Sequence, residues 1–409
     1  MKQNENKFDG DIVIIGSGIT GSSLACLLGE AGFNIILLGI DIKSEHKSKK
    51  NDPRVFAITI ASERILRKTG AWLSLKKESI SPFRRMHVWD KNGNGEIRFE
   101  SASICEPTMG HIISHGDILH ALHKRICDME NIKHIKGISP VKIKREVDAA
   151  ILDCDNGQQF ITKLIVAADG SNSKTRELLN INYQKYDYEQ SALASIVTTE
   201  IPHDEVARQR FFDDGPLAFL PMKNPYQSGI VWSSTPQHVK ELLKFDKVKF
   251  HSELETAFDN KLGKIIESTE PKVFPLSRAQ AEHYVLPRFA LIGDSAHTVH
   301  PLAGLGANLG LLDAACLAEI LIDTFNLDRD IGRLQVLRRY ERWRKGENQQ
   351  IMYLLDCFKY LFENKFQSVQ WLRNLGLDIV DEMPFFKNVI MARAMGLKGN
   401  LPRFARNYN

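Results

Sequence analysis

Residues 11–21 read DIVIIGSGITG, a short apolar run followed by a glycine-rich turn. Apolar residues then recur at helical spacing through 24–31, and a second apolar run at 34–38 completes a strand–helix–strand unit. In this context GxGxxG is a dinucleotide fingerprint. Gly16 makes the turn, Gly18 lets a pyrophosphate approach the backbone, and Gly21 lets the helix pack on the strand. The sequence therefore predicts an α/β domain of the Rossmann type.

The acidic residue that usually ends the second strand and binds the adenosine ribose is missing. Gly39 falls at that place, about twenty residues beyond the loop, and the nearest acid is Asp41. Asp41 either reaches the ribose or is a solvated loop residue. In the second case, backbone groups and water would hold the ribose.

A second motif lies in the middle of the chain, where LIVAA at 164–168 runs into DGSNS at 169–173. This pattern predicts a buried strand, a turn and a capped helix start. Such a turn places Asp169 and Gly170 at the carboxyl end of the sheet, where ligands bind in open α/β folds.

The third motif, LIGDSAHTVHPLAGLGANLGLLD at 291–313, predicts a strand, a tight loop and a helix from Ala307. The first N–H groups of a helix are unpaired and partly positive, which suits an anionic group such as a reduced flavin. Gly304 and Gly306 would let the backbone approach a flat ring, and Asp294 would accept hydrogen bonds from a sugar-alcohol chain. The alternative is a glycine-rich turn that only caps a core helix.

Composition narrows the class of protein. The 409 residues are 43% hydrophobic and 25% charged, with no apolar run long enough to predict a transmembrane helix and no signal-peptide pattern at the start. We therefore expect a cytoplasmic protein. The net charge of +4 is too small and too dispersed to indicate nucleic-acid binding. The six cysteines lack metal-ligand spacing, so we predict no metal site and reduced core thiols.

The remaining segments predict two further regions. Residues 83–99 resemble a hairpin around an Asn-Gly-Asn-Gly turn, and residues 183–275 alternate as in an antiparallel sheet. We expect a discontinuous cofactor domain (1–81, 101–181 and 276–345), a substrate domain (82–100 and 182–275) and a C-terminal helical region (346–409).

Taken together, GSGITG, ADGSNSKTR and GDSAHTVHPLAGLGANLG resemble the class A flavin-dependent aromatic monooxygenases. HTVHPLAG followed by NLGLLD resembles the ubiquinone-biosynthesis hydroxylases, and most of all their 2-polyprenylphenol hydroxylase branch. Similar segments, including DPRVFAIT, QRFFDDGPLAFLP and RRYERWRK, extend the resemblance over essentially the whole chain. It implies an α/β fold like that of para-hydroxybenzoate hydroxylase, with an inserted antiparallel-sheet substrate domain and a C-terminal helical region.

The resemblance also implies a function. NAD(P)H would reduce FAD, O2 would form a C4a-hydroperoxyflavin, and a polyprenylated phenol of ubiquinone biosynthesis would be hydroxylated on its ring. Contact with a membrane or with other ubiquinone-biosynthesis proteins would suit such a substrate. Two alternatives stay open: a flavin monooxygenase or reductase acting on another aromatic or prenyl substrate, and a non-catalytic flavoprotein scaffold.

The cofactor site follows residue by residue from the motifs and the resemblance. Arg54 matches the family's arginine near the flavin, although an ordinary surface arginine is the alternative. The carbonyl of Pro301 is the candidate for orienting the phenol, and no acid–base catalyst is assigned, since His297 and His300 are better explained as backbone-holding residues. The expected cofactor-binding residues are Gly16, Ser17, Gly18, Thr20, Gly21, Asp41, Arg54, His115, Asp169, Gly170, Gly293, Asp294, Pro301, Gly304, Leu305, Gly306, Ala307 and Asn308.

The chain departs from the family pattern at several of these places. Gly39 replaces the ribose-binding acid, Ser114-His115 replaces a Glu-Asn pair, Leu305 replaces a glutamine and Leu312 replaces a frequent arginine. Each change removes a polar cofactor contact, so we expect weaker or slower FAD retention rather than a lost site.

A polyprenyl chain would require an apolar slot. We expect it on the inner face of the substrate domain, around Phe211, Phe219 and Val231. The stretch 351–375 is helical, with Leu354, Phe358, Leu361 and Phe362 on one side. That side either packs in the core or contacts a membrane or partner, for which the basic run at 338–345 would be suited.

Overall fold

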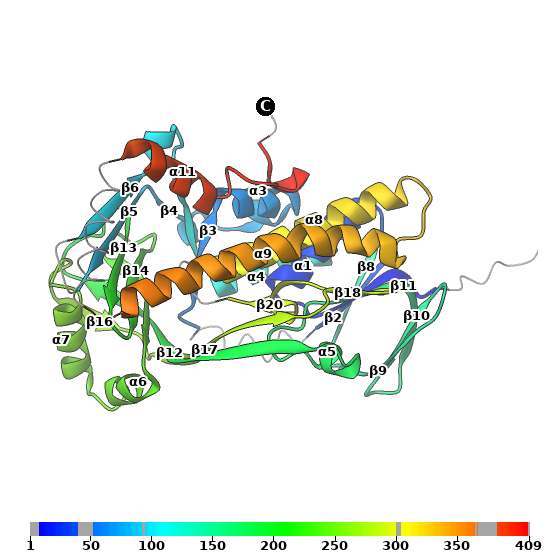
Figure 1. Cartoon of the computed structure of the whole chain (residues 1–409), viewed down its shortest axis with the longest axis horizontal. Coiled ribbons are helices and arrows are strands. Elements are labelled where there is room, and N and C mark those ends of the chain that lie inside the picture. Colours follow the sequence, from blue (N-terminus) through cyan, green and yellow to red (C-terminus); the bar gives the residue numbers. More distant parts are fainter. Residues whose placement is uncertain are drawn as a thin grey trace, which may run out of the picture.

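The computed structural model describes residues 8–39, 52–91, 95–299, 304–364, 366 and 383–407. Two large sheets lie one after the other along the long axis of the molecule, and the long helix α9 (Leu334–Glu363) runs beside both (Figure 1). The α/β fold class expected from the sequence is confirmed.

The first sheet is the predicted Rossmann-type core. Its parallel strands run in the order β19–β11–β1–β2–β8, with β18 antiparallel at one edge and the β9–β10 hairpin continuing from β11. The strands are β1 (Gly10–Ile15), β2 (Ile35–Gly39), β8 (Ile132–Lys136), β9 (Pro140–Arg145), β10 (Ala150–Cys154), β11 (Gln159–Ala167), β18 (Val285–Leu286) and β19 (Phe289–Leu291). Beside it, helix α1 (Ile19–Glu30) packs against both α4 (His115–Cys127) and α8 (Leu305–Phe325).

Helix α1 shows how local sequence sets this core. It begins directly after Gly18 and ends where Gly32 takes a positive φ of 86°. The N–H of Phe33 then bonds to the carbonyl of Leu28, and the N–H of Gly32 to that of Gly29, which is a Schellman ending. Leu24 and Leu28 are fully buried, so the helix start is held firmly at the end of β1.

The second sheet contains most of the strands expected in the substrate domain, together with His297–Thr298 from the segment expected in the cofactor domain. Its strand order is β20–β17–β12–β15–β14–β13–β5–β6, with β16 beside β12. All pairs are antiparallel except β5–β13, which is parallel because the chain enters this sheet twice. The strands are β5 (Arg85–Asp90), β6 (Glu96–Glu100), β12 (Tyr183–Thr199), β13 (Val206–Phe212), β14 (Gly215–Pro221), β15 (Gln227–Ser234), β16 (Ile265–Ser268), β17 (Lys272–Ala281) and β20 (His297–Thr298). Helices α6 (Pro236–Leu242) and α7 (Lys247–Ala257) cover one face of it.

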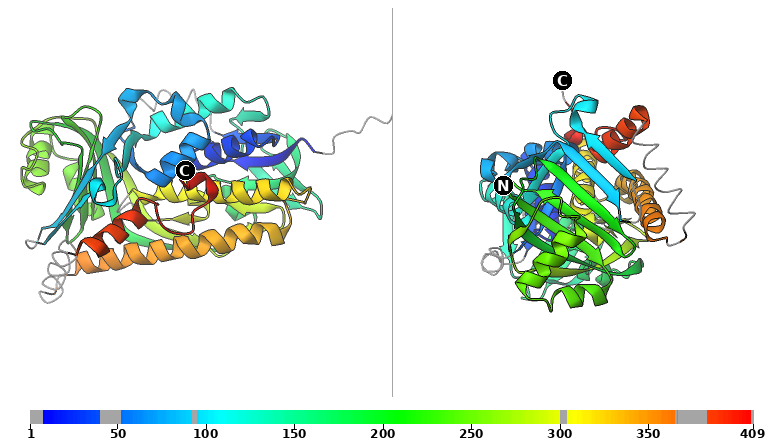
Figure 2. Two further views of the ribbon diagram at one scale, coloured as in Figure 1. Left: turned by 90° about the horizontal axis from the view of Figure 1, so that it is seen from above. Right: turned by 90° about the vertical axis from the view of Figure 1, so that its left-hand side faces the viewer.

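A three-stranded sheet and the C-terminal helices complete the described structure. Helix α11 (Pro384–Ala394) lies beside α9 on one flank of the molecule (Figure 2). The other elements are β3 (Val55–Thr59), β4 (Ser81–Phe83), β7 (Gly110–Ser114), α3 (Ile60–Lys68), α5 (Lys174–Leu178) and the 3-10 turns η1 (Ala71–Ser74), η2 (Lys77–Ser79), η3 (Ser101–Ile104), η4 (Gly293–Ser295) and η6 (Arg403–Ala405).

The division into domains stays a proposal, and its expected boundary between residues 275 and 276 falls inside strand β17. Helix α8 starts at Leu305 rather than Ala307 and is long and apolar enough to cross a membrane, but it is mostly buried between other elements, as a core helix is. The expectation that the cysteines lie in the core was wrong for three of the six, because Cys105, Cys127 and Cys357 are exposed.

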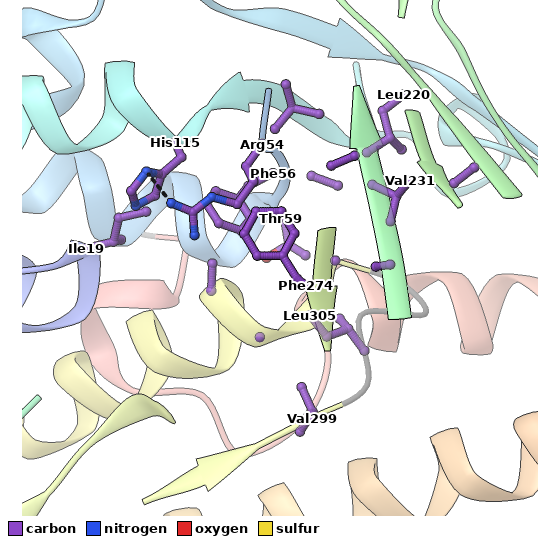
Figure 3. Close-up of a pocket in the computed structure, with 18 of the residues that line it drawn as sticks. Ile19, Arg54, Phe56, Thr59, His115, Leu220, Val231, Phe274, Val299 and Leu305 are labelled. Atoms are coloured by element: carbon purple, nitrogen blue, oxygen red, sulfur yellow. Dashed lines mark hydrogen bonds between the residues drawn. The ribbon is translucent and has the colours of Figure 1, made fainter. Parts of the chain in front are cut away.

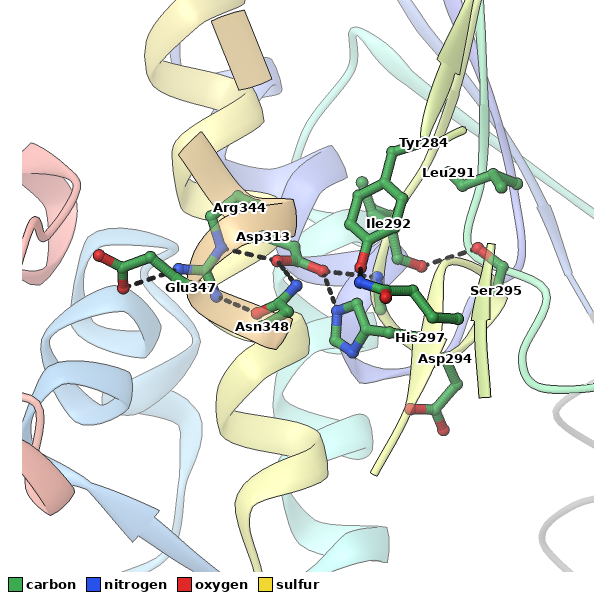
Figure 4. A network of polar contacts seen from close by, with 12 residues as sticks. Tyr284, Leu291, Ile292, Asp294, Ser295, His297, Asp313, Arg344, Glu347 and Asn348 are labelled. Carbon is green, nitrogen blue, oxygen red and sulfur yellow. Dashed lines mark hydrogen bonds and ion pairs between the residues drawn. The ribbon is translucent and has the colours of Figure 1, made fainter. Parts of the chain in front are cut away.

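A buried polar network joins α8, α9 and the loop after β19 (Figure 4). Asp313 of α8 accepts hydrogen bonds from Nε of Arg344 at 2.8 Å, from Nε2 of His297 at 2.6 Å and from the N–H of Gly293 at 3.0 Å. Burial by itself would raise the pKa of Asp313, but the charges of His297 and Arg344 hold it well below its usual range. The carboxylate is therefore ionised inside the core.

Removing this charge is predicted to destabilise the fold. In Asp313→Asn, Arg344 stays buried with no carboxylate on its Nε, so we expect a loss of about 3–5 kcal/mol in the free energy of unfolding. Glu30→Gln is the matched control, because it neutralises an exposed partner of Arg125 and should cost less than about 1 kcal/mol. Urea denaturation of both variants measures the difference, and equal losses would contradict the assignment.

Candidate active site

Three loops from distant parts of the sequence meet at the carboxyl ends of the parallel strands. They follow β1, β11 and β19, which are neighbours in the sheet. Thr20, in the first turn of α1, packs against Gly293 of the third loop and Gly310 of α8, since a Cβ built on these glycines would lie 3.0 or 2.4 Å from its Oγ1. The fingerprint loop and the late motif therefore form one surface.

The glycines of the first loop have the distinct tasks that the spacing predicts. Gly16 has a φ of 113°, and a Cβ there would lie 2.2 Å from the carbonyl oxygen of Ala168. A Cβ on Gly21 would lie 1.9 Å from the carbonyl oxygen of Gly16. A Cβ on Gly18 would meet no atom within 4 Å. The first two glycines thus allow close packing, whereas Gly18 leaves the backbone open to a ligand.

Asp169 has one oxygen available beside this loop. Its Oδ2 accepts hydrogen bonds from the N–H and the hydroxyl of Thr175, at 3.1 and 2.7 Å. Its Oδ1 is buried and accepts no hydrogen bond from the described part of the chain. Gly170, with a φ of 83°, lines the adjoining cavity. An unsatisfied acceptor of this kind suits a ligand that brings hydroxyl donors.

Arg54 and His115 lie together at one side of the cavity (Figure 3). Asp52 holds Arg54 through two oxygens, with an Nη2–Oδ2 distance of 2.6 Å, and lies 3.4 Å from Nδ1 of His115. Burial would raise the pKa of Asp52, but the hydrogen bonds from His115 and Arg54 hold it well below its usual range. The carboxylate of Asp52 thus orients the guanidinium of Arg54. The guanidinium carbon lies 5.3 Å from the ring centre of Phe274.

The third loop presents the start of helix α8 to the cavity. Gly304, with a φ of 60°, caps the helix, and Leu305, Gly306 and Ala307 line the cavity with its first turn. The side chain of Asn308 is used within the protein, bonded to the carbonyls of Ala57 and Gly304 and to the N–H of Thr59. It ties α8 to β3 and leaves ligand contacts to the preceding backbone.

Asp294 faces the cavity, while its neighbour His297 does not. Asp294 is accessible to solvent and lines the cavity. His297 is buried and its Nε2 lies 2.6 Å from the carboxylate of Asp313, so the expectation that this side chain holds backbone was wrong, although its role is structural. The predicted residues Asp41 and Pro301, and also His300, lie outside the described residues.

One cavity of about 590 Å³ extends from these loops to the second sheet. Side chains alternate across the strands of that sheet, so Ala194, Ala218 and Val231 face the cavity while Leu193, Leu217 and Ile230 pack beneath α7. Alanines leave space where larger residues would fill it. Met86, Met109 and Met395 line the cavity as well, and flexible thioethers suit an apolar ligand of irregular shape.

The expected slot was right for Val231 and wrong for the two phenylalanines. Phe219 is one residue beyond Ala218 and therefore points to the opposite face, where it stacks on Phe258 with ring centres 3.8 Å apart. Phe211 is covered by Phe362 of α9, with ring centres 3.9 Å apart. The sequence did not reveal which face of each strand another element would cover.

The described residues suit FAD. Gly18 and the start of α1 offer an open backbone for a pyrophosphate, Asp169 has a free acceptor, and the first turn of α8 lies beside Arg54 at the flavin end. Two residues that the sequence analysis did not assign support these loops. They are Asp52, which orients Arg54, and Arg176, which is buried and donates to the carbonyls of Ser171 and Ser295. Their sequence signals were the segments DPR and DGSNSKTR.

At the ribose end, the replacement of the expected acid by Gly39 involves more than the loss of one side chain. A Cβ on Gly39 would lie 1.9 Å from Oγ and 2.4 Å from Cβ of Ser17. The serine of the fingerprint loop therefore occupies the space beside position 39. Nε2 of His134 would lie 3.0 Å from the same Cβ, and burial lowers the pKa of His134 to about 4. A side chain at position 39 would therefore collide with Ser17, so an acid fits there only if Ser17 is changed as well.

Comparisons with known proteins show the family of this chain and support FAD as its cofactor. Residues 9–353 match the FAD binding domain family. The mitochondrial ubiquinone biosynthesis monooxygenase COQ6 of Danio rerio is 32% identical, covering 94% of this chain and 89% of the relative. The 3-demethoxyubiquinol 3-hydroxylase of Escherichia coli is 29% identical, covering 95% and 98%. The crystal structure of p-nitrophenol 4-monooxygenase PnpA from Pseudomonas putida DLL-E4 shares the fold, with a TM-score of 0.77, 16% identity and coverage of 95% and 98%.

The ribose end yields a prediction. Gly39→Glu alone should weaken FAD binding, because the new side chain collides with Ser17. Ser17→Gly combined with Gly39→Glu should bind FAD about tenfold more tightly than the parent, since hydrogen bonds to a carboxylate contribute ~1.5–3 kcal/mol. Flavin fluorescence titration measures the affinity, with Ser17→Gly as the control. A double variant no tighter than the parent would contradict the view that Gly39 weakens FAD retention.

Proposed function

Because this chain belongs to the family of FAD-dependent monooxygenases that includes the ubiquinone-biosynthesis hydroxylases, we propose that it hydroxylates the ring of a polyprenylated phenol. It is an oxidoreductase, with FAD as the cofactor and O2 as the co-substrate. The observation that carries the choice of substrate is the single cavity that joins the flavin loops to an apolar sheet face. A small polar phenol would not need that extension.

The chain's own residues would bind, orient and exclude water. FAD, when bound, supplies the activation of O2. Arg54, held by Asp52, brings positive charge to the flavin end. The N–H groups at the start of α8 bring partial positive charge to the same place, which favours an anionic reduced cofactor. Both groups are fixed before any ligand arrives.

The apolar wall would hold the aromatic ring and keep the site dry. Phe274 and Leu276 of β17 and Val231 of β15 line the cavity from the two strands that flank β12 in the second sheet. Water excluded by such a wall cannot break down reactive oxygen species formed beside it. An electron-rich phenol needs positioning more than acid–base help, so the proposal assigns no catalytic side chain. Pro301 remains the proposed contact for the phenol hydroxyl.

Several finer statements belong to the proposal. NAD(P)H or another reductant would supply the electrons. The protein would work in the cytoplasm and reach its substrate at a membrane surface, alone or with other proteins of ubiquinone biosynthesis. The support for a surface location is chemical, because a polyprenyl chain partitions into lipid rather than water.

Substrate turnover tests the proposal directly. The purified protein should show flavin absorption bands that survive desalting. With NAD(P)H, O2 and a detergent-solubilised polyprenylated phenol, it should release a product that is heavier by one oxygen atom. Mass spectrometry of the product and the absorbance of NAD(P)H give the two measurements. Consumption of NAD(P)H without an oxygenated product would favour another substrate. A protein that binds FAD but neither consumes NAD(P)H nor releases a product would favour the non-catalytic scaffold.

The cavity wall provides a second test. Ala218→Phe should lower kcat/KM for the prenylated phenol at least about tenfold, because overfilling a packed site costs ~1–3 kcal/mol. FAD affinity should be unchanged, since Ala218 lies on the sheet and not on the flavin loops. Ala218→Val should give an intermediate effect. If Ala218→Phe lost both FAD binding and activity, the proposed division of the cavity into a cofactor end and a substrate end would be wrong.

A further inference from the structure

The last turns of helix α9 turn an apolar face to solvent. Tyr353, Leu354, Cys357, Tyr360 and Leu361 recur at helical spacing and are all exposed, with Tyr353 at 63% and Tyr360 at 80%. On the opposite side, Met352, Leu355 and Phe362 are buried against the second sheet. The expectation of core packing is thus wrong for Leu354 and Leu361 and confirmed for Phe362, while the side chain of Phe358 lies outside the description.

Helix α11 continues this surface. Figure 2 shows it beside α9, and Nη2 of Arg393 donates to Oε1 of Gln350 across the two helices at 3.2 Å. Val389 and Ile390 are exposed, whereas Met391 and Met395 are buried over β3, β4 and β7. Both helices therefore bury one apolar face and expose another, which a helix that only covers a core does not need.

The segment that contains α11 carries only positive charges, whereas the last turns of α9 carry Asp356 and Glu363 beside Lys359. Residues 383–409 contain five cations, Lys387, Arg393, Lys398, Arg403 and Arg406, and no aspartate or glutamate. Arg403 is paired with Asp323, which fastens the C-terminal segment to helix α8. Arg393, Lys398 and Arg406 are exposed. Exposed apolar and tyrosine side chains next to cations match the boundary of an anionic lipid surface.

The surface also adjoins the substrate cavity. Ala394 and Met395, at the end of α11, line the cavity, and Ala394 is exposed as well. The cavity therefore approaches the outside of the molecule at the end of α11. A prenyl chain leaving a bilayer at this point would pass from lipid to the methionine-lined end of the cavity without crossing water.

We propose that the exposed face of α9 and α11, made of Tyr353, Leu354, Tyr360, Val389 and Ile390, docks on an anionic lipid bilayer and admits the prenylated substrate beside α11. The proposal rests on the proposed function for the identity of the substrate. The docking itself rests on exposure and charge. A second copy of the chain is the competing occupant.

Sedimentation with vesicles tests the docking. The FAD-loaded full chain should pellet with vesicles of phosphatidylcholine and phosphatidylglycerol, and pelleting should decrease as salt rises. The double variant Leu354→Glu/Ile390→Glu should lower the partition coefficient at least about tenfold, because two apolar contacts are lost and two like charges face the lipid headgroups. The matched control is Leu73→Glu/Val248→Glu, at exposed apolar sites elsewhere with 88% and 80% exposure, and it should pellet as the parent does.

The outcomes separate the hypotheses. A parent protein that does not pellet overturns the docking surface, as does equal loss in both double variants. A parent that is dimeric in solution, with a Leu354→Glu/Ile390→Glu variant that is monomeric, would make the surface an interface between copies. Hydroxylation of the substrate should persist in detergent for that variant and fall only with substrate in vesicles. Vesicle binding without any hydroxylation in detergent would leave the docking intact and overturn the proposed function.

Discussion

The buried carboxylate of Asp313 is the interaction on which the site depends. It lies in the core with no solvent exposure and is surrounded by groups from α9, from the loop after β19 and from the adjoining strand β20. A buried charge is tolerated only when it is paired and hydrogen-bonded, so Arg344, His297 and the N–H of Gly293 must stay in place together. Asp294 follows Gly293 directly and faces the cavity. The contact between α8 and α9 therefore also fixes the position of the loop that faces the ligand.

The two sheets contribute different properties to the cavity. Parallel strands bring their carboxyl ends to one edge, so glycine loops and helix starts from distant parts of the sequence meet there. The second sheet contributes a flat wall, where alternation places alanines and Val231 toward the ligand and larger side chains toward α7. A polar cofactor end and an apolar substrate end therefore share one space, which suits oxygen chemistry on a poorly soluble phenol.

The departures from the family pattern have different structural consequences. Ser17 occupies the space that a side chain at position 39 would need, so the identities of residues 17 and 39 depend on each other. His115 meets the carboxylate that also holds Arg54, so its ring has a partner where an amide is usual. Leu305 lines the cavity through the first turn of α8, whose N–H groups do not depend on the side chain. The backbone groups that would contact the cofactor are therefore kept at places where the side chains differ.

The sequence by itself determined the cofactor loops and the fold class. Glycine spacing, strand ends and helix starts are local properties, because each depends on backbone geometry within a few residues. Only the tertiary structure decided the pairing of Asp313 with Arg344, the orientation of Phe219 away from the cavity and the exposure of Leu354. These depend on which element covers which face, and a periodic pattern identifies an apolar face without identifying what lies against it. For the same reason the sequence did not show that a Cβ at position 39 would collide with Ser17, since residues on separate elements become neighbours only when the sheet has formed.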